Sequence, residues 1–522
     1  MVSRRRALTL ISVAAASVAG CNSLRSGDDS DDVDADGDDV PEDDGSQSET
    51  PGDEGTPSET SDEDDGNEDD QGEADQGEDN QSEDQGDDQS DEDGSKDEEP
   101  PDEGEQPGST VLDVRDYGAG EDGFPDDTRA IQDAIDDAES GDTVLIPESD
   151  RDYILDPRNS PHEYAILRIQ GDNYPDNLTI EGEGVGSVLR IAPDIEDIET
   201  YQMLAVDVQD GIEGLEIRNF RLQGSIREHD HEKTRVVHGI RIGNATSAAA
   251  GNVDVLVEDV RCGAVRGIGF KADVGGVRFN RCTASKSYWH GFETTAAEVT
   301  DGTSVIEDPP IEVTNSYAGQ CGVKGGGHYG HNASGGKSIT RNFVASGCFQ
   351  ATKVTSPTTS VEYRNVRFED SVGAGFQRTG DSGFPDVTWG NAVFENNGYR
   401  AITGRLTAHT FLDGAELVAT GNATRSDWDV HFYQEATLNA KDATLYVTDS
   451  QAGTALEWES EKTGELGVFG AAENENEDLY ANGNLTIHEK QDDAKRDLDA
   501  VPTAEEVGAW SEPSTESTGI DQ

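Results

Sequence analysis

VLDVRDYGAGEDGFPDDTRAIQDAIDDAESGDTVLIP, residues 111–147, predicts a short strand, a glycine-rich turn, an amphipathic helix and a second strand. Asp126 or Asp127 is placed to cap the N-terminus of the helix, which we expect over residues 128–139. The apolar residues of this helix fall on one face at spacings of three and four residues: Ile131, Ala134, Ile135 and Ala138. The helix therefore has one face to bury against whatever follows it.

Gly141 ends the predicted helix, and an apolar strand begins at Thr143. The sequence D-x-x-D-Y-G-A, then D-D-T-x-A-I-x-x-A-I, then T-V-x-I-P resembles the opening segment of the pectate-lyase-like superfamily. That superfamily of right-handed parallel β-helices includes polysaccharide lyases, glycoside hydrolases, uronate epimerases and phage tailspikes. The resemblance covers about one coil and its cap, and it implies a fold rather than a reaction, because one fold hosts many chemistries.

A repeat of short strands follows from residue 212 onward. First strands are expected as LEIRNF at 215, VLVEDV at 255, VRFNRC at 277, IEVTNS at 311, VEYRNV at 361 and AVFENN at 392. Second strands are expected as HGIRIG at 238, GIGFKA at 267, HGFETT at 290, CGVKGG at 321 and AGFQRT at 374. Such coils must stack, because none buries its own apolar face.

We therefore predict an all-β fold over residues 110–490, a single-stranded right-handed parallel β-helix of the pectin-lyase-like type. The helix at 128–139 would cover the open strand edge of the first coil. Residues 491–522 are expected to form a C-terminal cap and a disordered tail.

The N-terminal residues 1–21 predict a targeting segment. Ser3-Arg4-Arg5-Arg6-Ala7-Leu8 resembles a twin-arginine export signal, and Val18-Ala19-Gly20-Cys21 resembles a lipoprotein cleavage box. The apolar run 7–20 is shorter than the ~20 residues that span a bilayer. We expect an extracellular protein, anchored to the cell-surface membrane by a lipid on Cys21. A weak membrane anchor with an incidental cysteine is the alternative.

Residues 22–109 predict a disordered acidic linker, because residues 28–105 contain 39 acidic residues and one basic residue, Lys96. From Ser109 onward, 72 acidic residues outnumber 33 basic ones, a net charge of −39, and only ten of the basic residues are Lys. This composition is typical of salt adaptation, as in halophilic archaea, although an acidic protein of ordinary environments is the alternative. The acidic excess argues against nucleic-acid binding.

Alignment of the second strands predicts a column of side chains that point outward, one per coil. The expected members are Arg241, Lys271, Glu293, Lys324, Lys353 and Gln377. Coils are ~4.8 Å apart, so the column forms a basic stripe that would suit an acidic, uronate-containing polysaccharide. The alternative is a solvated face whose Lys and Glu side chains pair across coils.

Two unusual segments lie near the middle of this column, Ser287–Glu293 (SYWHGFE) and Gly325–Asn332 (GGGHYGHN). We predict catalytic roles for Lys324, His290, His328, Tyr329 and Glu293. We predict substrate binding by Arg241, Lys271, Lys353, Tyr288 and Trp289. His328 and His331 are too few to define a metal site, and His290 has the alternative of pointing into the core.

These residues favour a polysaccharide lyase, in which cations neutralise the uronate carboxylate while His, Lys or Tyr transfers protons. No cofactor is certain; a bound Ca²⁺ could replace the cations. A uronate C5-epimerase would use the same residues. A glycoside hydrolase needs two carboxylates, ~5–5.5 Å or ~6.5–9.5 Å apart, and the aligned column offers only Glu293. A non-catalytic glycan-binding adhesin is the remaining alternative.

Four cysteines lie in the coils: Cys262, Cys282, Cys321 and Cys348. Cys262 and Cys282 both follow Arg, so we expect them on adjacent coils, either joined in a disulfide or free.

Overall fold

The computed structural model describes residues 109–121, 126–170, 175–193, 195, 201–208, 211–224, 237–243, 252–295, 309–322, 328–355, 360–378, 385–472, 477–492 and 500–508. All of them belong to one compact unit, Glu98–Gln522. The expected targeting segment with Cys21, and the acidic linker up to residue 108, lie outside the described residues. Within the described ranges, no helix is long and apolar enough to cross a membrane.

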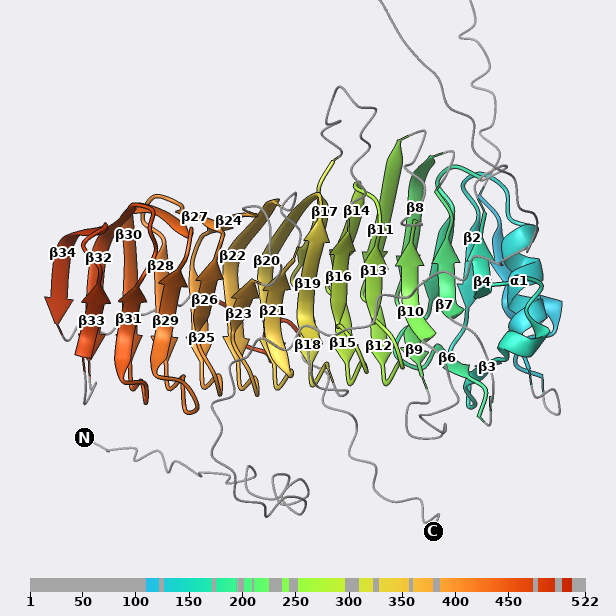
Figure 1. Ribbon diagram of the computed structural model, residues 1–522. Helices are drawn as coiled ribbons and strands as arrows, with labels where there is room; N and C mark the ends of the chain where they lie inside the picture. Colours follow the sequence, from blue (N-terminus) through green and yellow to red (C-terminus); the bar gives the residue numbers. More distant parts are fainter. Residues whose placement is uncertain are drawn as a thin grey trace, which may run out of the picture. The chain divides into compact units, whose positions relative to one another are not determined.

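The chain winds into a right-handed parallel β-helix whose coils stack side by side (Figure 1). One face is a sheet of twelve parallel strands, and we call its solvent side the outward face. Its strands, in order, are β4 (Ala165–Ile169), β7 (Tyr201–Val206), β10 (Val237–Ile242), β13 (Phe270–Ala272), β16 (Phe292–Thr295), β19 (Tyr329–Gly335), β21 (Gln350–Val354), β23 (Phe376–Arg378), β26 (Ile402–Arg405), β29 (Trp428–Tyr433), β31 (Thr454–Trp458) and β33 (Glu477–Ala481).

The other strands form two further ladders, joined by strands long enough to cross both. One ladder runs through β1 (Val111–Asp113), β2 (Thr143–Ile146), β5 (Thr179–Gly182), β8 (Ile212–Arg218), β11 (Val253–Glu258), β14 (Val277–Asn280), β17 (Ile311–Thr314), β20 (Lys337–Ser346), β22 (Ser360–Glu369), β24 (Asp386–Trp389), β27 (Ala408–Phe411), β30 (Thr437–Thr448), β32 (Gly464–Ala472) and β34 (Leu485–Asp492). The other runs through β3 (Tyr153–Leu155), β6 (Val188–Ile191), β9 (Arg221–Gln223), β12 (Arg261–Gly263), β15 (Thr283–Ser285), β18 (Tyr317–Gly319), the second halves of β20 and β22, β25 (Ala392–Glu395), β28 (Glu416–Thr420) and the second halves of β30, β32 and β34.

The helix α1 (Thr128–Asp136) packs at the N-terminal end of the coils, beside the 3-10 turns η1 (Val114–Tyr117) and η2 (Pro157–Asn159) (Figure 1). It ends three residues earlier than expected. Its Gln132 amide donates to the Arg168 carbonyl at 2.9 Å and accepts from the Arg168 N–H at 2.8 Å. Because Arg168 lies on β4, the edge strand, one buried glutamine satisfies backbone groups that a further strand would otherwise pair. The helix therefore covers the edge of the sheet and also provides hydrogen-bond partners for the backbone of Arg168 on the edge strand.

Of the two aspartates before α1, one occupies the N-cap position and the other makes the hydrogen bond to the start of the helix. Asp127 occupies the N-cap position but makes no capping hydrogen bond. Its buried carboxylate instead accepts from Ile154 N–H at 2.7 Å and pairs with Arg151 at 2.8 Å. Asp126 accepts from the Thr128 N–H at 3.1 Å, so the side-chain hydrogen bond at the helix start comes from the residue before the cap.

Two of the expected strands are wrong. The segment AVFENN is not a first strand: β25 pairs with the second half of β22, and β24 is the first strand of that coil. The segment CGVKGG does not form the strand beside β16, because β19 occupies that place, with His331 opposite Phe292. The first error came from counting two strands per coil, whereas each complete coil has three.

Aromatic rings stack in the interior, and a ladder of half-buried asparagines runs along one turn. Phe270 and Phe292 stack at 5.0 Å between centroids, and Tyr363 stacks on Trp389 at 5.0 Å. At the turn between the two ladders that β20 and β22 join, a row of asparagines begins with Asn280 as acceptor, and each following side-chain amide donates to the amide oxygen one coil before, over 2.9–3.4 Å. The members are Asn280, Asn315, Asn342, Asn365 and Asn391. Such amide rows satisfy turn polar groups without water.

All four cysteines of the coils are free and buried. Cys262 and Cys282 lie on adjacent coils as expected, but Cys262 is opposite Ala284 in the strand register and not opposite Cys282. Burial raises the pKa of the Cys262 and Cys282 thiols, which leaves them protonated packing groups.

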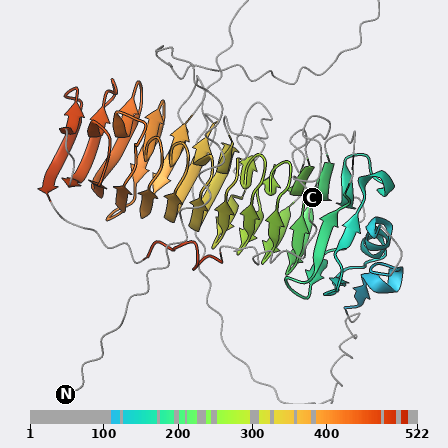
Figure 2. The ribbon, with the colours of Figure 1, turned by 90° about the horizontal axis from the view of Figure 1, so that it is seen from below.

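The segment 500–508 lies along the flank of the coils, whereas we expected a cap over the last coil. Thr283 Oγ1 donates to the Gly508 carbonyl at 3.3 Å, and Arg367 Nε donates to the Pro502 carbonyl at 3.2 Å. Figure 2 shows this segment, in dark red, beside the middle coils. Residues 506–508 also line a groove of about 460 Å³ on that flank.

Candidate functional site

One residue per coil forms an outward column on the twelve-stranded sheet, as the strand register shows. Its members, from the N-terminal end, are Arg168, Ala205, Arg241, Lys271, Glu293, Asn332, Lys353, Gln377, Thr403, His431, Glu457 and Tyr480. Arg241, Lys271, Glu293 and Lys353 occupy the places expected for them. Asn332, however, stands where Lys324 was expected, and Lys324 lies outside the described residues.

The sequence contains a pattern that identifies Asn332, and not Lys324, as the column residue of this coil. Residues before the outward column repeat the pattern X-Gly-apolar, with the column residue next: His290-Gly291-Phe292-Glu293 and Tyr329-Gly330-His331-Asn332. A Cβ on Gly291 would lie 2.7 Å from the Gly330 carbonyl oxygen and 2.9 Å from the Ala318 Cβ, so the glycine marks the tight bend before the strand. The polar His331 concealed the match, because it stands at an apolar position.

His331 is an interior residue. Its ring is fully buried, with Nδ1 3.2 Å from the Tyr363 hydroxyl and Nε2 3.3 Å from Thr294 Oγ1. His328 is half-buried and stacks on Trp289 at 5.8 Å between centroids. The two histidines therefore do not form a metal site together.

The cations of the column are paired within a chain of alternating charge. Arg241 Nε lies 2.7 Å from Asp273 Oδ2, while Lys271 Nζ lies 3.6 Å from Asp273 Oδ1 and 3.5 Å from Glu293 Oε2. Asp273 is fully buried and Glu293 is half-buried. Burial raises the pKa of Glu293, and Lys271 opposes that rise. Arg241 and Lys271 thus follow the alternative in which charges pair across coils, but the pairing also fixes their positions.

A second row of side chains lies three residues before the column and includes His238, His290 and Tyr329. His290 is 9 % exposed, and its Nδ1 accepts from the Tyr329 N–H at 3.0 Å. His238 Nδ1 accepts from the Ile268 N–H in the same way, at 3.0 Å. Burial lowers the pKa of His290 well below its usual value, so its ring is neutral with the proton on Nε2. His290 can therefore donate a hydrogen bond, but it has no lone pair left to accept a proton.

Three further predicted site residues lie around His290: Tyr329, Lys353 and His328. Tyr329 stacks on the His290 ring at 5.2 Å, and Lys353 Nζ lies 4.8 Å from the Tyr329 ring centroid. The His328 ring lies 5.3 Å from that of His290. Tyr288 faces elsewhere, with the Arg266 guanidinium 5.8 Å from its ring. We call the group formed by Arg241, Lys271, Asp273, Trp289, His290, Glu293, His328, Tyr329 and Lys353 the central cluster.

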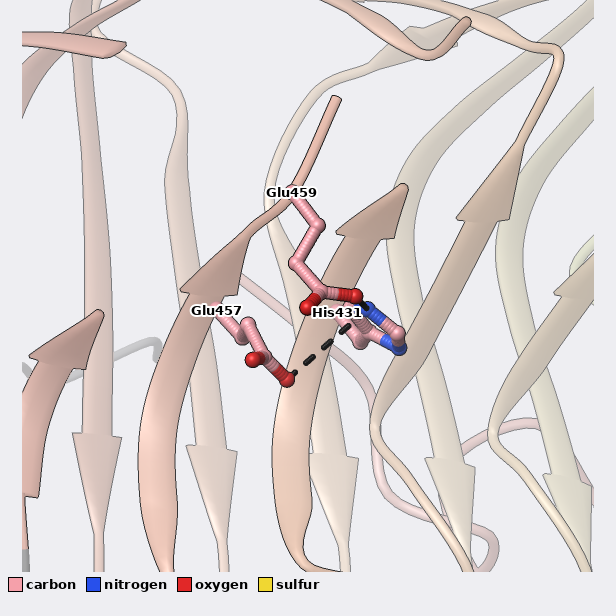
Figure 3. A group of neighbouring side chains, drawn as sticks. All are labelled: His431, Glu457 and Glu459. Carbon is pink, nitrogen blue, oxygen red and sulfur yellow. Dashed lines mark hydrogen bonds and ion pairs between the residues drawn. The ribbon is translucent and has the colours of Figure 1, made fainter. Parts of the chain in front are cut away.

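The sequence missed a second cluster on the same face. His431 and Glu457 belong to the outward column, and Glu459 follows two residues after Glu457, just beyond the end of β31 (Figure 3). His431 Nε2 lies 3.1 Å from Glu459 Oε2 and 3.8 Å from Glu457 Oε2. Arg400 donates from a terminal nitrogen to His431 Nδ1 at 3.2 Å. We call Arg400, His431, Glu457 and Glu459 the Arg–His–Glu cluster; a longer alignment of the column would have found two of its members.

This second cluster is the one group of three possible metal ligands among the described residues. A guanidinium has donors only, so His431 Nδ1 must be the acceptor and Nε2 must carry the ring proton. A metal-bound imidazole nitrogen carries no proton, and the opposite nitrogen then donates. Arg400 blocks that arrangement, and Ca²⁺ prefers six to eight oxygen ligands. The Arg–His–Glu cluster therefore does not fit a metal ion.

Comparisons with known proteins give fold neighbours. No protein-family model matches the chain, and no curated protein matches it. Among solved structures, the A-module of the mannuronan C-5 epimerase AlgE4 from Azotobacter vinelandii is 16 % identical, with a TM-score of 0.41, over 72 % of this chain and 99 % of that one. An Acinetobacter phage tailspike is 12 % identical, with a TM-score of 0.40, over 74 % of this chain and 63 % of that one. A GH87 α-1,3-glucanase from Streptomyces thermodiastaticus is 14 % identical, with a TM-score of 0.36, over 75 % of this chain and 70 % of that one.

Proposed function

We propose that this chain is a carbohydrate-active protein of the pectate-lyase-like superfamily that binds an acidic, uronate-containing polysaccharide and cleaves it by β-elimination. The observation that carries the proposal is the outward column, which sets Arg241, Lys271 and Lys353 along one line of coils. The rest of the chain is strongly acidic, so these cations form a local exception that suits an anionic polymer. Their partial burial strengthens each charge interaction with a bound carboxylate.

The reaction needs a neutralised substrate carboxylate, a proton acceptor at C5 and a proton donor for the leaving oxygen. Arg241 and Lys271 would hold the carboxylate. A carboxylate that binds Lys271 competes with Glu293 for that ammonium, which raises the pKa of Glu293 further and makes it the better base. We therefore assign proton abstraction to Glu293 and hydrogen-bond donation to His290.

Protonation of the leaving oxygen would fall to Lys353 or Tyr329, which lie next to each other. The Tyr329 phenol is protonated at neutral pH, but the residue is buried and burial raises its pKa, which makes it a weaker acid. His328, and Lys324 outside the described residues, remain our further candidates for proton transfer. Trp289 would stack against a sugar ring.

The test uses the purified full chain at high salt with pectate and alginate, with ultraviolet absorbance and reducing ends followed together. A rise in both signals indicates β-elimination, because the new chain end carries an unsaturated uronate. Lys271→Ala and Lys353→Ala should abolish the reaction, whereas Lys490→Ala, an exposed ion-paired lysine on β34, should not.

Other outcomes would replace the proposal. Reducing ends without absorbance would indicate hydrolysis, and exchange of the C5 proton without cleavage would indicate epimerisation. Binding alone would indicate an adhesin. Full activity in both lysine variants would show that the central cluster is not the site.

We also propose that the chain is exported and held at the cell surface by a lipid on Cys21. The support is the sequence Val18-Ala19-Gly20-Cys21 after a twin-arginine pattern. Cys21→Ser should release the protein from the membrane fraction into the medium. Retention of that variant in the membrane fraction would mean that another feature anchors the chain.

A further inference from the structure

His431 of the Arg–His–Glu cluster lies on β29, five coils beyond Glu293 and three coils beyond Lys353 on the outward face. At ~4.8 Å per coil, His431 is ~24 Å from Glu293 and ~14 Å from Lys353, too far for one sugar residue to touch both clusters. The role assigned to the central cluster therefore leaves this second group of side chains unexplained.

An aromatic row crosses β29 at this place. The Trp428 and His431 ring centroids are 4.7 Å apart, and those of His431 and Tyr433 are 4.6 Å apart. Trp428 and Tyr433 are half-buried, so part of each ring remains open to solvent. Flat aromatic surfaces beside a few fixed polar groups are typical of small-molecule sites.

Arg400 holds this row in place and is not offered to a ligand. Its Nε donates to Ser426 Oγ at 3.0 Å, and its terminal nitrogens donate to His431 Nδ1 at 3.2 Å and to the Tyr399 hydroxyl at 3.1 Å. The guanidinium also lies 4.8 Å from the Trp428 ring centroid. Arg400 is 7 % exposed and donates three hydrogen bonds to protein atoms, so the cluster has no exposed cation for an acidic sugar.

Two carboxyl groups face the row, those of Glu457 and Glu459, and Glu457 can be protonated near neutral pH because its pKa is raised to about 7. Glu457 is 7 % exposed, and its Oε2 atom has no hydrogen-bond donor among the described residues. Glu459 is 48 % exposed at its side chain and accepts from His431. One ligand-binding atom from each of His431, Glu457 and Glu459 lies within 4.8 Å of the other two. An unpaired buried acceptor costs free energy until a donor reaches it, and sugar hydroxyls are donors.

The protonation of the group agrees with an uncharged ligand. Burial, and then repulsion by Glu459, raises the pKa of Glu457 to about 7. Burial and the neighbouring Arg400 lower the pKa of His431 to about 4, although Glu459 opposes the shift. At neutral pH the ring is neutral, and any bound carboxylate would face Glu459 without a free counter-charge.

We propose that the Arg–His–Glu cluster is a second carbohydrate site, which takes an uncharged pyranose residue that packs against the exposed part of Trp428 and is bound through its hydroxyls by Glu457 and Glu459. The inference rests on carbohydrate binding by the outward face, as in the proposed function, but not on cleavage there. An acidic polysaccharide that also contains neutral sugars could engage both clusters at once.

The experiment titrates the full chain at high salt with uncharged oligosaccharides (gluco-, galacto-, manno- and xylo-oligomers), with oligouronates, and with Ca²⁺, Mn²⁺ and Zn²⁺ alone, by calorimetry. We expect at least one uncharged oligosaccharide to bind. Trp428→Ala should weaken that binding at least tenfold, Trp428→Phe less, and Glu459→Gln severalfold. Tyr164→Ala removes an aromatic ring that is 56 % exposed at the start of β4 and should change nothing.

Glu459 is half exposed, so its substitution tests the site even if a Trp428 variant fails to fold. The inference is overturned if no uncharged oligosaccharide binds, or if binding survives both Trp428→Ala and Glu459→Gln. It is also overturned if a metal ion alone binds and His431→Ala removes it, or if oligouronates bind here. The binding titration does not measure cleavage, so failure here leaves the lyase proposal standing, and failure of the lyase assay leaves this site standing.

Discussion

Replacement of Asp429 by asparagine should make the protein more stable, and only above acidic pH. Asp429 follows Trp428 on β29 and is fully buried. The neighbouring coils have alanines at the corresponding position, Ala401 and Ala455. Burial raises its pKa from 3.8 to about 7, against smaller opposing contributions from Ser450 and the Ala401 N–H. The folded protein therefore binds this proton more tightly than the unfolded chain does.

A raised pKa in the folded state stabilises the fold only while the group stays protonated. Below pH 3.8 both states are protonated, and the residue contributes no pH dependence. As the pH rises toward 7, the unfolded chain ionises first, and the fold loses stability. The shift is about three pKa units, each worth about 1.36 kcal/mol, so the full loss is about 4 kcal/mol.

The assay is urea unfolding at constant high salt between pH 4 and pH 8.5, for the parent and for Asp429→Asn. The free energies of unfolding should nearly agree at the acidic end and diverge to about 4 kcal/mol in favour of the variant at the alkaline end. Asp442→Asn, the same substitution at an exposed position on β30, is the control and should show no such divergence. A difference between parent and Asp429→Asn that does not change with pH would refute the reasoning.

Three further predictions concern the fold and its surface. The four buried thiols of the coils should resist a thiol reagent in the native protein and react once urea unfolds it; rapid native labelling would contradict their burial. Gln132→Leu should cost about 1–3 kcal/mol in urea unfolding, because it leaves the β4 edge groups of Arg168 unpaired, and an unchanged stability would mean that water replaces the amide. The melting temperature should rise with KCl concentration, because salt screens the acidic surface; a melting temperature independent of salt would argue against salt adaptation.

The N-terminal part of the fold was predictable from sequence because local signals agree there. The helix face formed by Ile131 and Ile135 and the strand at Thr143 appear in the structure, and Gly141 has the positive φ of a turn, although α1 already ends at Asp136. The spacing of apolar residues is a short-range property, and α1 and β2 depend on it directly. The end of α1, three residues early, is the kind of boundary that such spacing does not define.

Farther along, the alignment of coils depends on long-range stacking, and there the sequence was less informative. Lys324 looked like a column residue because it follows an apolar residue after a glycine, yet Asn332 takes the place. The second cluster escaped notice because His431 and Glu457 come from coils outside the aligned set, and their proximity arises only when the strands pair. Pairing of Arg241 with the buried Asp273 likewise depends on register and burial, which spacing alone does not give.

The structure of the full chain with a bound oligouronate, in the Glu293→Gln variant, tests the central claim most directly. We predict that the sugar lies along the outward face, with a uronate carboxylate within ion-pair distance of Lys271 or Arg241 and with a sugar C5 next to residue 293. An oligouronate bound on either of the other two faces, or in the flank groove beside residues 506–508, would contradict the account.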